Sequence, residues 1–440
     1  MIKKILGICL ICTLCACTKE SDESVNPRNN WIYNQMIVNY LWNDEIPVSV
    51  NFSEPDSKIF FSSLLFSQDK WSNITSDYKN LIADLTGEIV SLPYGYTAYL
   101  LSDKSVCLRV TYLYSGSDAE KKGLKRGDII IAINGTKMNS NNFTSVAHGS
   151  SNFTVTLGKV QGNNIIPDRT ISFSTEVASI SPIIYYDIIQ TSTCKVGYIV
   201  YVSFANGAND MYLKEMDNIF STFKSNGVSQ LIVDLRYNPG GLIGPAIQLA
   251  SKIAPANVVN SNSILANLVY NNDIQKNIPP QNTRYLFDKN EVTTNLNLDN
   301  VYFLTTKGTA SASELVIAGL KPYMNIIQIG TNTYGKFMGA VTIPDNDKQW
   351  AISPIVMKYS NAHGLTDFYD GLPYDFLLEE TLATELHTLG SKSDPFLSKA
   401  LDLIDGTTKA IEAPIIRQDE FPKVLEIHDD SRNNLFINPL

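Results

Sequence analysis

The sequence predicts an α/β core that follows a smaller β-rich module, and three observations lead to this fold class. From about residue 180, apolar runs of the buried parallel type alternate with amphipathic helical stretches, as at 196–204, 210–225 and 231–235. Residues 90–175 instead contain segments in which apolar residues occupy every second position, which is typical of half-buried strands. The chain has 440 residues, of which 44% are hydrophobic and 18% charged, so it can build two or three globular domains.

The order of these patterns divides the chain into six segments. They are a signal peptide (1–17), a polar tether (18–29), an N-terminal helical region (30–88), the β-rich module (89–177), the α/β core (178–408) and a C-terminal tail (409–440). The tail is polar and contains three prolines, so we expect it to be loosely ordered. Within the core, residues 256–300 are rich in Asn and poor in apolar residues. We expect an excursion over the core surface there, as a lid or a substrate wall.

The first segment has the features of a bacterial targeting sequence. Lys3 and Lys4 precede the apolar run Ile5–Ala16, which is too short to span a bilayer as a mature helix. The run ends in Leu14-Cys15-Ala16-Cys17, which resembles the lipobox of bacterial lipoproteins. That resemblance implies cleavage before Cys17, lipidation of its thiol and a membrane-anchored protein of the cell envelope. We expect the outer membrane, on its periplasmic or its surface-exposed face.

Composition argues against two other classes of function. A net charge of −9 gives no electrostatic support for nucleic-acid binding. The four histidines lie far apart in the sequence, so a histidine-rich metal site is not expected. Cys107 and Cys194 fall within strand-like runs, and we expect them to be buried free thiols. The sequence leaves the oligomeric state open.

A serine and a lysine stand at the ends of two predicted core strands. Ser311 follows the apolar run 301–306, and Lys336 follows the run 325–330. Parallel α/β sheets place their chemistry at such strand ends, so the pair suggests a serine nucleophile with a lysine general base. A structural interpretation competes with this one, because Ser311 and Glu314 also have the spacing of a helix capping box. The two are compatible, since free amides at a helix N-terminus stabilise an oxyanion.

A lysine can act as a general base only in its neutral form. Free lysine has a pKa near ~10.4, so roughly 0.04% of it is neutral at pH 7. A general base should have a pKa near the working pH, and burial among apolar groups can lower the lysine pKa that far. The residues adjacent to Lys336 carry no charge and favour such burial: Tyr334, Gly335, Phe337, Met338 and Gly339.

The β-rich module contains an ordered string that resembles a PDZ domain. Residues 119–135 combine the end of a capped short helix, Gly-Leu-x-x-Gly-Asp-Ile-Ile, and Asn134-Gly135, which favours a type I′ hairpin turn. PDZ domains bind peptide C-termini by adding a strand to a sheet edge. The resemblance implies that Tyr94-Gly95-Tyr96, just before an expected strand at 97–101, forms the loop that takes the peptide carboxylate.

The complete order of motifs resembles the C-terminal processing peptidases, also called tail-specific proteases, in their Bacteroidetes-type lipoprotein form. The resemblance covers residues 31–405 and includes the family spacing of 25 residues from Ser311 to Lys336 (336 − 311 = 25). It implies a serine endopeptidase with a Ser–Lys dyad that acts on polypeptides without a cofactor or metal. It also implies an oxyanion hole formed by the amides of Ala312 and of Gly240 or Gly241.

The same resemblance implies the architecture of the core. We expect a crotonase- and Clp-protease-like core of ββα units, joined to the PDZ-like domain and the N-terminal helices. The PDZ-like domain would recognise unfolded or C-terminal segments of the substrate.

One position departs from the family pattern. Many members have a glutamine four residues after the lysine, whereas this chain has Ala340, which cannot hydrogen-bond Lys336. Another group must then orient the lysine, and the candidates are backbone carbonyls, Tyr334 and Thr342. The alanine keeps open an alternative, a non-catalytic peptide-binding envelope lipoprotein of the same fold. A third hypothesis, an acyl hydrolase acting on esters, is disfavoured by the peptide-binding module.

Overall fold

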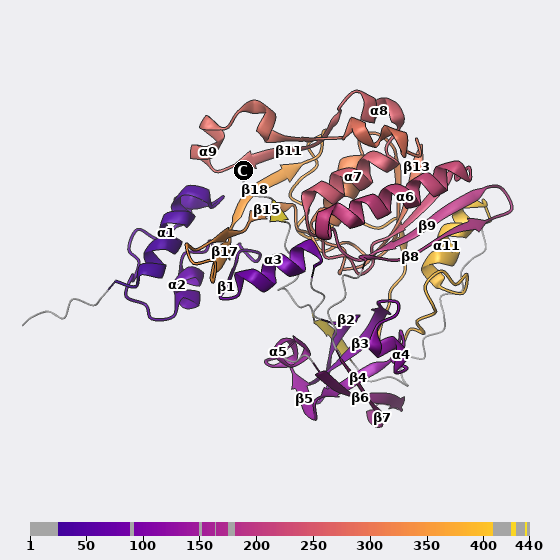
Figure 1. Cartoon of the computed structure of the whole chain (residues 1–440), viewed down its shortest axis with the longest axis horizontal. Helices are drawn as coiled ribbons and strands as arrows, with labels where there is room; N and C mark the ends of the chain where they lie inside the picture. Colours follow the sequence, from indigo (N-terminus) through magenta and orange to yellow (C-terminus); the bar gives the residue numbers. More distant parts are fainter. Residues whose placement is uncertain are drawn as a thin grey trace, which may run out of the picture.

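The computed structural model describes most of the chain. It covers residues 25–88, 92–148, 152–162, 164–174, 181–407, 424–427 and 436–437. Cys17 lies outside the described residues, so its lipidation stays a prediction. Figure 1 shows the PDZ-like domain as a separate lobe below the core, with the N-terminal helices to one side. Within the described ranges, none of the helices is both long and apolar enough to cross a membrane.

A six-stranded sheet forms the centre of the core. Its strand order is β19-β14-β13-β10-β9-β8, and every neighbouring pair is parallel except β8 with β9. The strands are β8 (Ile183–Gln190), β9 (Lys195–Tyr201), β10 (Gln230–Asp234), β13 (Asn300–Thr305), β14 (Asn325–Gly330) and β19 (Phe376–Leu377). Four of these six, β9, β10, β13 and β14, lie where the sequence predicts an apolar strand, and helices separate these four along the chain, so the α/β class is confirmed.

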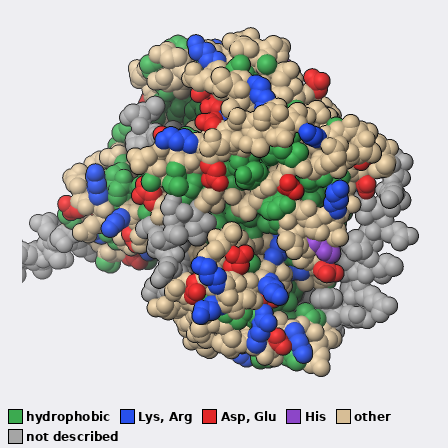
Figure 2. Space-filling model, turned by 45° about the vertical axis from the view of Figure 1, so that its right-hand side comes forward, with side chains coloured by type: hydrophobic (Ala, Val, Ile, Leu, Met, Phe, Trp, Pro, Cys, Tyr) green, Lys and Arg blue, Asp and Glu red, His purple; other side chains and the backbone are tan. Residues whose placement is uncertain are grey.

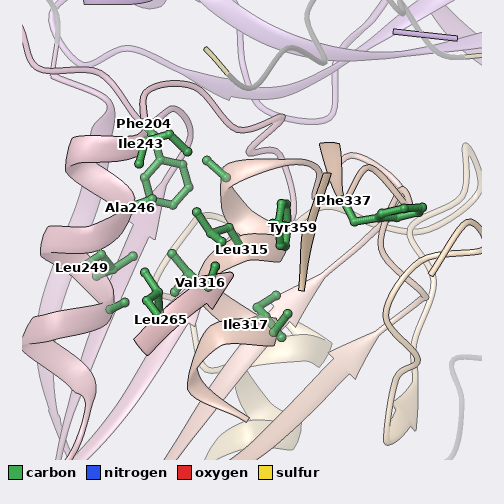
Figure 3. Close-up of a cluster of buried hydrophobic side chains, with 14 of the residues drawn as sticks. Phe204, Ile243, Ala246, Leu249, Leu265, Leu315, Val316, Ile317, Phe337 and Tyr359 are labelled. Atoms are coloured by element: carbon green, nitrogen blue, oxygen red, sulfur yellow. The ribbon is translucent and has the colours of Figure 1, made fainter. Parts of the chain in front are cut away.

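Helices cover both faces of this sheet because its strands are apolar on both sides. They are α6 (Met211–Ser225), α7 (Ile243–Ile253), α10 (Ala312–Leu320) and α11 (Pro395–Ile404). Leu231 and Val233 of β10 pack on the face of α6, α7 and α10, whereas Ile232 packs on the face of α11. Figure 3 shows Leu315 and Val316 of α10 packed near the side chains of α7. Helix α10 is buried along its whole length, so its N-terminus is held rigidly.

A second sheet carries the strand that follows Lys336. Its order is β12-β11-β18-β15-β21. The strands are β11 (Ile264–Tyr270), β12 (Arg284–Leu286), β15 (Met338–Val341), β18 (Ile355–Ser360) and β21 (Phe436–Ile437). Its pairs are antiparallel except β15 with β21.

The segment at residues 256–300 is an excursion over the core surface only in part, because its first strand is buried in the core whereas most residues between 272 and 290 are exposed. It contributes α8 (Ala256–Asn260), β11, α9 (Asn272–Asn277), η3 (Pro280–Thr283), β12 and η4 (Lys289–Thr293). Leu265 of β11 is fully buried against α10, where a Cβ added to Gly319 would lie 2.4 Å from the Leu265 Cδ1. A short strand and a few helical turns bury their apolar residues in a core even when the segment as a whole is polar.

The tail also differs from the sequence expectation. Within residues 409–440, Val424–Ile427 forms strand β20 and Phe436–Ile437 forms strand β21. Each strand adds to the edge of a sheet built by a distant part of the chain. Edge pairing needs only backbone groups, so composition alone could not predict it.

The N-terminal region is mostly helical, as expected. It contains α1 (Pro27–Asn39), η1 (Asn43–Glu45), α2 (Ser57–Ser63) and α3 (Tyr78–Thr86). Asn26, Asp56 and Asp77 cap the three α-helices through their side chains. Strand β1 (Asn73–Thr75) joins this region to the core through a small sheet with β17 (Ala351–Ser353) and β16 (Ile343–Pro344).

The β-rich module forms a seven-stranded sheet when strand β20 is included. The order is β20-β2-β3-β5-β4-β6-β7, with β3 also paired to β4. Its elements are β2 (Tyr94–Leu101), β3 (Ser105–Leu113), α4 (Asp118–Lys121), β4 (Ile129–Ile133), β5 (Thr136–Asn139), α5 (Phe143–His148), β6 (Asn152–Gln161) and β7 (Asn164–Ser174). Asn134 and Gly135 both have positive φ, 51° and 75°, between β4 and β5, which agrees with the predicted type I′ turn. Figure 2 shows hydrophobic side chains gathered across the middle of one face, above the PDZ-like lobe.

Candidate active site

Ser311 stands on a strained turn between β13 and α10. Its backbone has φ 61° and ψ −111°, a conformation that costs a non-glycine residue about 1–3 kcal/mol. The turn is held by neighbours on both sides, because Thr309 Oγ1 donates to the Leu235 carbonyl at 2.7 Å and the Ala310 amide donates to the Asn238 carbonyl at 3.1 Å. The Ser311 Oγ is buried and makes no hydrogen bond to the described residues. A buried, unpartnered hydroxyl on a strained turn is typical of a nucleophile held ready for attack.

Glu314 joins the loop of the serine to the loop of the lysine. One of its carboxylate oxygens accepts the amides of Ser311 and Lys336, both at 2.8 Å. The other accepts the Gly335 amide at 2.6 Å and the Thr333 hydroxyl at 2.5 Å. The capping box predicted at Ser311 is therefore half present, because Glu314 accepts the Ser311 amide while the serine side chain caps nothing.

The four donors around Glu314 determine its protonation state. Three are backbone amides, and the Thr333 hydroxyl already accepts the Leu372 amide at 2.7 Å, so its own hydrogen is directed to Glu314. Burial raises the pKa of Glu314, but these hydrogen bonds favour the ionised form. Four donors leave no acceptor for a carboxylic-acid proton, so Glu314 is a buried anion.

Lys336 is fully buried at the start of the segment that leads into β15. Burial lowers the pKa of Lys336 from its ordinary value of 10.5 to about 7, and the negative charges of Asp69 and Glu314 act in the opposite direction. At that pKa about half of the side chain is neutral at pH 7. The sequence expectation of a lowered lysine pKa therefore agrees with the burial of the side chain.

The glycine loop after β10 lies against the turn of the serine. Gly240 and Gly241 have φ 109° and 135°, which favour glycine. A Cβ added to Gly240 would lie 2.8 Å from the Ser311 Cβ, and one added to Gly241 would lie 2.3 Å from the Phe204 carbonyl oxygen. The Gly240 amide donates to Asn238 Oδ1 at 2.9 Å. Neither the Gly241 amide nor the Ala312 amide has an acceptor among the described residues.

A buried cluster of ionic side chains stabilises the glycine loop. Arg236 is fully buried and pairs with Asp234 at 2.7 Å, Glu380 at 2.7 Å and Asp394 at 3.0 Å. Burial alone would lower the pKa of Arg236, but these carboxylates, Asp234 foremost, hold it well above the ordinary value. The cluster fixes the position of the loop that begins at Arg236.

The PDZ-like domain reaches this cluster through Arg126. Its guanidinium donates to the Tyr237 hydroxyl at 2.7 Å and pairs with Glu380 at 3.0 Å. Tyr237 in turn donates to Glu380 at 2.6 Å, and it lies next to the loop residue Asn238. The β-rich module and the glycine loop are therefore connected by direct hydrogen bonds, which the sequence did not reveal.

The predicted carboxylate loop is not a loop. Tyr94, Gly95 and Tyr96 are the first residues of strand β2, where the pairing with β3 shifts register between Gly95 and Tyr96. Tyr94 is buried in the core of the domain, and a Cβ added to Gly95 would lie 2.1 Å from the Tyr112 ring. Of the three, Tyr96 is the one that is partly exposed, and its hydroxyl lies 3.2 Å from His148 Nε2 at the end of α5. The close approach of the Tyr112 ring explains the glycine at position 95, since only glycine leaves room for it.

Ala340 and the candidate Thr342 lie in and just after β15, the strand that follows Lys336. Ala340 is fully buried in β15 and is paired with Ile355 of β18. Thr342 lies two residues further on, where its hydroxyl is 3.2 Å from the Ser353 hydroxyl. Sequence reasoning missed Asp69. Its negative charge raises the pKa of Lys336 more than the charge of Glu314 does. Its carboxylate accepts a hydrogen bond from the Tyr40 hydroxyl at 2.8 Å. No local pattern could have found it, because 267 residues separate it from Lys336 (336 − 69 = 267).

Comparisons with known proteins agree with this site. The peptidase family S41 model matches residues 195–376, and the model of the peptidase S41 N-terminal domain matches residues 28–73. The carboxyl-terminal-processing protease of Synechocystis is 26% identical over 333 residues, which are 75% of this chain and 71% of that protein. The chloroplastic carboxyl-terminal-processing peptidase 1 of Arabidopsis thaliana is 26% identical over 236 residues, which are 53% of this chain and 44% of that protein.

Solved structures show the same fold. The crystal structure of a putative S41 protease from Bacteroides fragilis superimposes with a TM-score of 0.69 at 26% identity, over 86% of this chain and 98% of that one. The photosystem II D1 C-terminal processing protease has a TM-score of 0.51 at 19% identity over 80% of this chain and 92% of that one, so it supports the fold alone. The family and fold expected from the motifs are confirmed: this chain belongs to peptidase family S41, the family of the carboxyl-terminal-processing serine peptidases.

Proposed function

We propose that the protein is a serine endopeptidase in which Ser311 and Lys336 form the catalytic dyad. The observation that carries this proposal is a fully buried lysine with a pKa of about 7, tied through Glu314 to the turn of an unpartnered serine hydroxyl. Neutral Lys336 takes the proton of Ser311 as its Oγ attacks the peptide carbonyl carbon. The proton then passes to the leaving amine as the peptide C–N bond breaks. Water, activated by the same lysine, hydrolyses the acyl-enzyme.

The oxyanion of the tetrahedral intermediate needs two donors that no protein group already occupies. The amides of Gly241 and Ala312 meet this condition among the described residues, whereas the Gly240 amide is bonded to Asn238. We therefore narrow the oxyanion hole to Gly241 and Ala312, with Gly240 supplying the close approach to Ser311. Each such donor contributes about 2.7–4 kcal/mol to transition-state stabilisation in other serine peptidases.

Polypeptides are the substrate class of the proposal, and their delivery through the PDZ-like domain is part of it. The edge of β2 supports this, because a peptide can add to a sheet edge as a further strand. Anchoring in the cell envelope through Cys17 is also proposed, on the lipobox resemblance alone.

The test is digestion of an unfolded, fluorescent protein substrate between pH 6 and 10. We expect the wild-type protein to cleave it, and Ser311→Ala and Lys336→Ala to lose about 10⁴-fold or more in rate while keeping their fold. The rate should rise with pH through about 7, because the neutral lysine is the active form. Cleavage that survives either substitution would contradict the dyad.

The alternative function, peptide binding without cleavage, has one observation in its favour, the alanine at position 340. It predicts a wild-type protein that binds unfolded peptide and cleaves none of it. Peptide hydrolysis by the wild type would end this alternative.

A further inference from the structure

Two short strands of the C-terminal tail lie on two separate sheet edges. Strand β20 pairs antiparallel with β2, with Val424 opposite Leu101 and Ile427 opposite Ala98. Strand β21 pairs parallel with β15, with Phe436 opposite Ala340. Figure 1 shows these strands, coloured toward yellow, beside the indigo-to-purple β2 and beside β15. Because both contacts are made through backbone groups, any extended polypeptide could in principle make them instead.

The edge of β2 is the edge to which a peptide would add. β2 has β3 on its other side, so β20 takes the last free row of hydrogen-bonding groups on this strand. Strand β20 runs antiparallel to β2, so it points toward the Tyr94–Tyr96 end of β2, where Tyr96 is partly exposed beside the end of α5. This is the direction in which a strand added to a PDZ-like edge would run.

The edge of β15 lies beside the dyad. β15 begins two residues after Lys336, and its other side is bonded to β18. Strand β21 occupies the remaining side at Ala340 and Val341. Without β21 this side of β15 would be an edge of the sheet that carries the lysine segment, so a substrate that extends past Ser311 and Lys336 could add there as a strand.

We propose that the edges of β2 and β15 form one polypeptide-binding track and that strands β20 (Val424–Ile427) and β21 (Phe436–Ile437) of the same chain occupy it in the resting protein. A substrate must displace these strands before it can reach the dyad. The effect of the tail on cleavage rests on the proposed peptidase function, but the pairing of the tail with β2 and β15 does not depend on catalysis. A tethered segment has an effective concentration in the millimolar range, so even the short contact with β15 competes with free substrate.

The first test is whether a disulfide between β20 and β2 forms in the full chain, which shows whether β20 is paired with β2. Leu100 and Leu425 are opposite partners, and opposite Cβ atoms lie about 4.5–5.5 Å apart, near the reach of a disulfide. Leu100 packs on the face away from the native Cys107. With oxidised glutathione as oxidant, we expect Leu100→Cys/Leu425→Cys to cross-link and the out-of-register pair Leu100→Cys/Glu426→Cys not to. Absence of the in-register cross-link overturns the proposal.

The rate of substrate cleavage then tests whether the seated tail blocks access to the dyad. We expect the cross-linked protein to cleave unfolded substrate at least tenfold more slowly than the same protein after reduction. Equal rates before and after reduction overturn the blocking role, even though the peptidase function stands.

Two single proline substitutions at neighbouring positions of β20 test the same blocking role without a cross-link. In an antiparallel edge strand only alternate amides face the partner, so one of Leu425→Pro and Glu426→Pro removes a bond to β2 and the other removes none. We expect one variant to be several-fold more active than the wild type and the other to match it. Two unchanged variants contradict the proposal.

A binding measurement separates this inference from the peptidase function. If no form cleaves substrate, the proposed function fails, and a fluorescein-labelled peptide of residues 421–430 becomes the readout. At least tenfold weaker binding to the cross-linked than to the reduced protein supports the occupied track. Equal binding to both forms overturns it.

Discussion

Arg236 and Lys336 are both fully buried cations close to the candidate site, yet their surroundings act on them in opposite ways. Arg236 pairs directly with three carboxylates, which hold its pKa well above the ordinary value. Burial is the dominant influence on Lys336, and the carboxylate of Glu314 is already occupied by four donors. Direct pairing with three carboxylates therefore keeps Arg236 charged, whereas burial outweighs the charges of Asp69 and Glu314 at Lys336 and makes it a base.

The largest expected effect is that Arg236→Met and Lys336→Met change the free energy of unfolding in opposite directions. Arg236→Met should lower the free energy of unfolding by about 3–5 kcal/mol, because it leaves buried carboxylates without their partner. Lys336→Met should raise it by about 1–4 kcal/mol at pH 7, because it removes the cost of burying an amine. Urea unfolding of both variants measures the difference. A loss of stability in Lys336→Met would show that the interactions of Lys336 with Asp69 and Glu314 outweigh the cost of its burial.

The gain from Lys336→Met should also depend on pH with a defined sign. The folded-state pKa of about 7 lies below the ordinary value of 10.5, so the unfolded chain binds more protons between these values. The cost of burying Lys336 is present in full below pH 7 and fades as the pH rises toward 10.5. Unfolding curves at pH 6, 8 and 10 should show a shrinking advantage of the methionine variant.

Glu314→Gln should produce an intermediate effect. The glutamine amide group would face two N–H or O–H donors, so the turn of Ser311 and the loop of Lys336 would separate. We expect a loss of about 1–3 kcal/mol in stability and up to roughly 100-fold in kcat. Ser313→Ala is the matched control, since it removes one hydrogen bond to the Asn238 carbonyl from the same turn of α10. Equal effects of the two variants on kcat would argue against a positioning role for Glu314.

Asp69→Asn should have the smallest effect, on the pH profile. Removing this negative charge should lower the pKa of Lys336, so the rise of activity should move to lower pH by less than about one pH unit. The pH dependence of kcat/KM measures this shift. Asp77→Asn keeps a capping side chain on α3 and removes a charge that is not among those acting on Lys336, so it should leave the midpoint unchanged. A midpoint that does not move in Asp69→Asn would remove Asp69 from the electrostatics of the site.

The core and the dyad positions could be predicted from the sequence because their signals are local. The buried run before Asp234, the amphipathic helix that became α6 and the Asn134-Gly135 turn each depend on neighbours within one element. Ser311 and Lys336 stand at strand ends, which the apolar runs before them already indicate. The segment at 256–300 was misread in part, because a strand such as β11 needs few apolar residues when a helix covers it.

Tertiary structure alone decided the chemistry of these residues. The pKa of Lys336 depends on the burial that the whole fold provides and on Asp69, which the N-terminal region contributes. The Gly240 amide is bonded to Asn238, whereas the amides of Gly241 and Ala312 have no acceptor in the part of the chain that the structure describes. The pairing of the tail follows from edges built by distant segments. Residue type and periodicity thus determined which groups stand at the site, whereas desolvation and long-range hydrogen bonds, which act through space, decided what those groups can do.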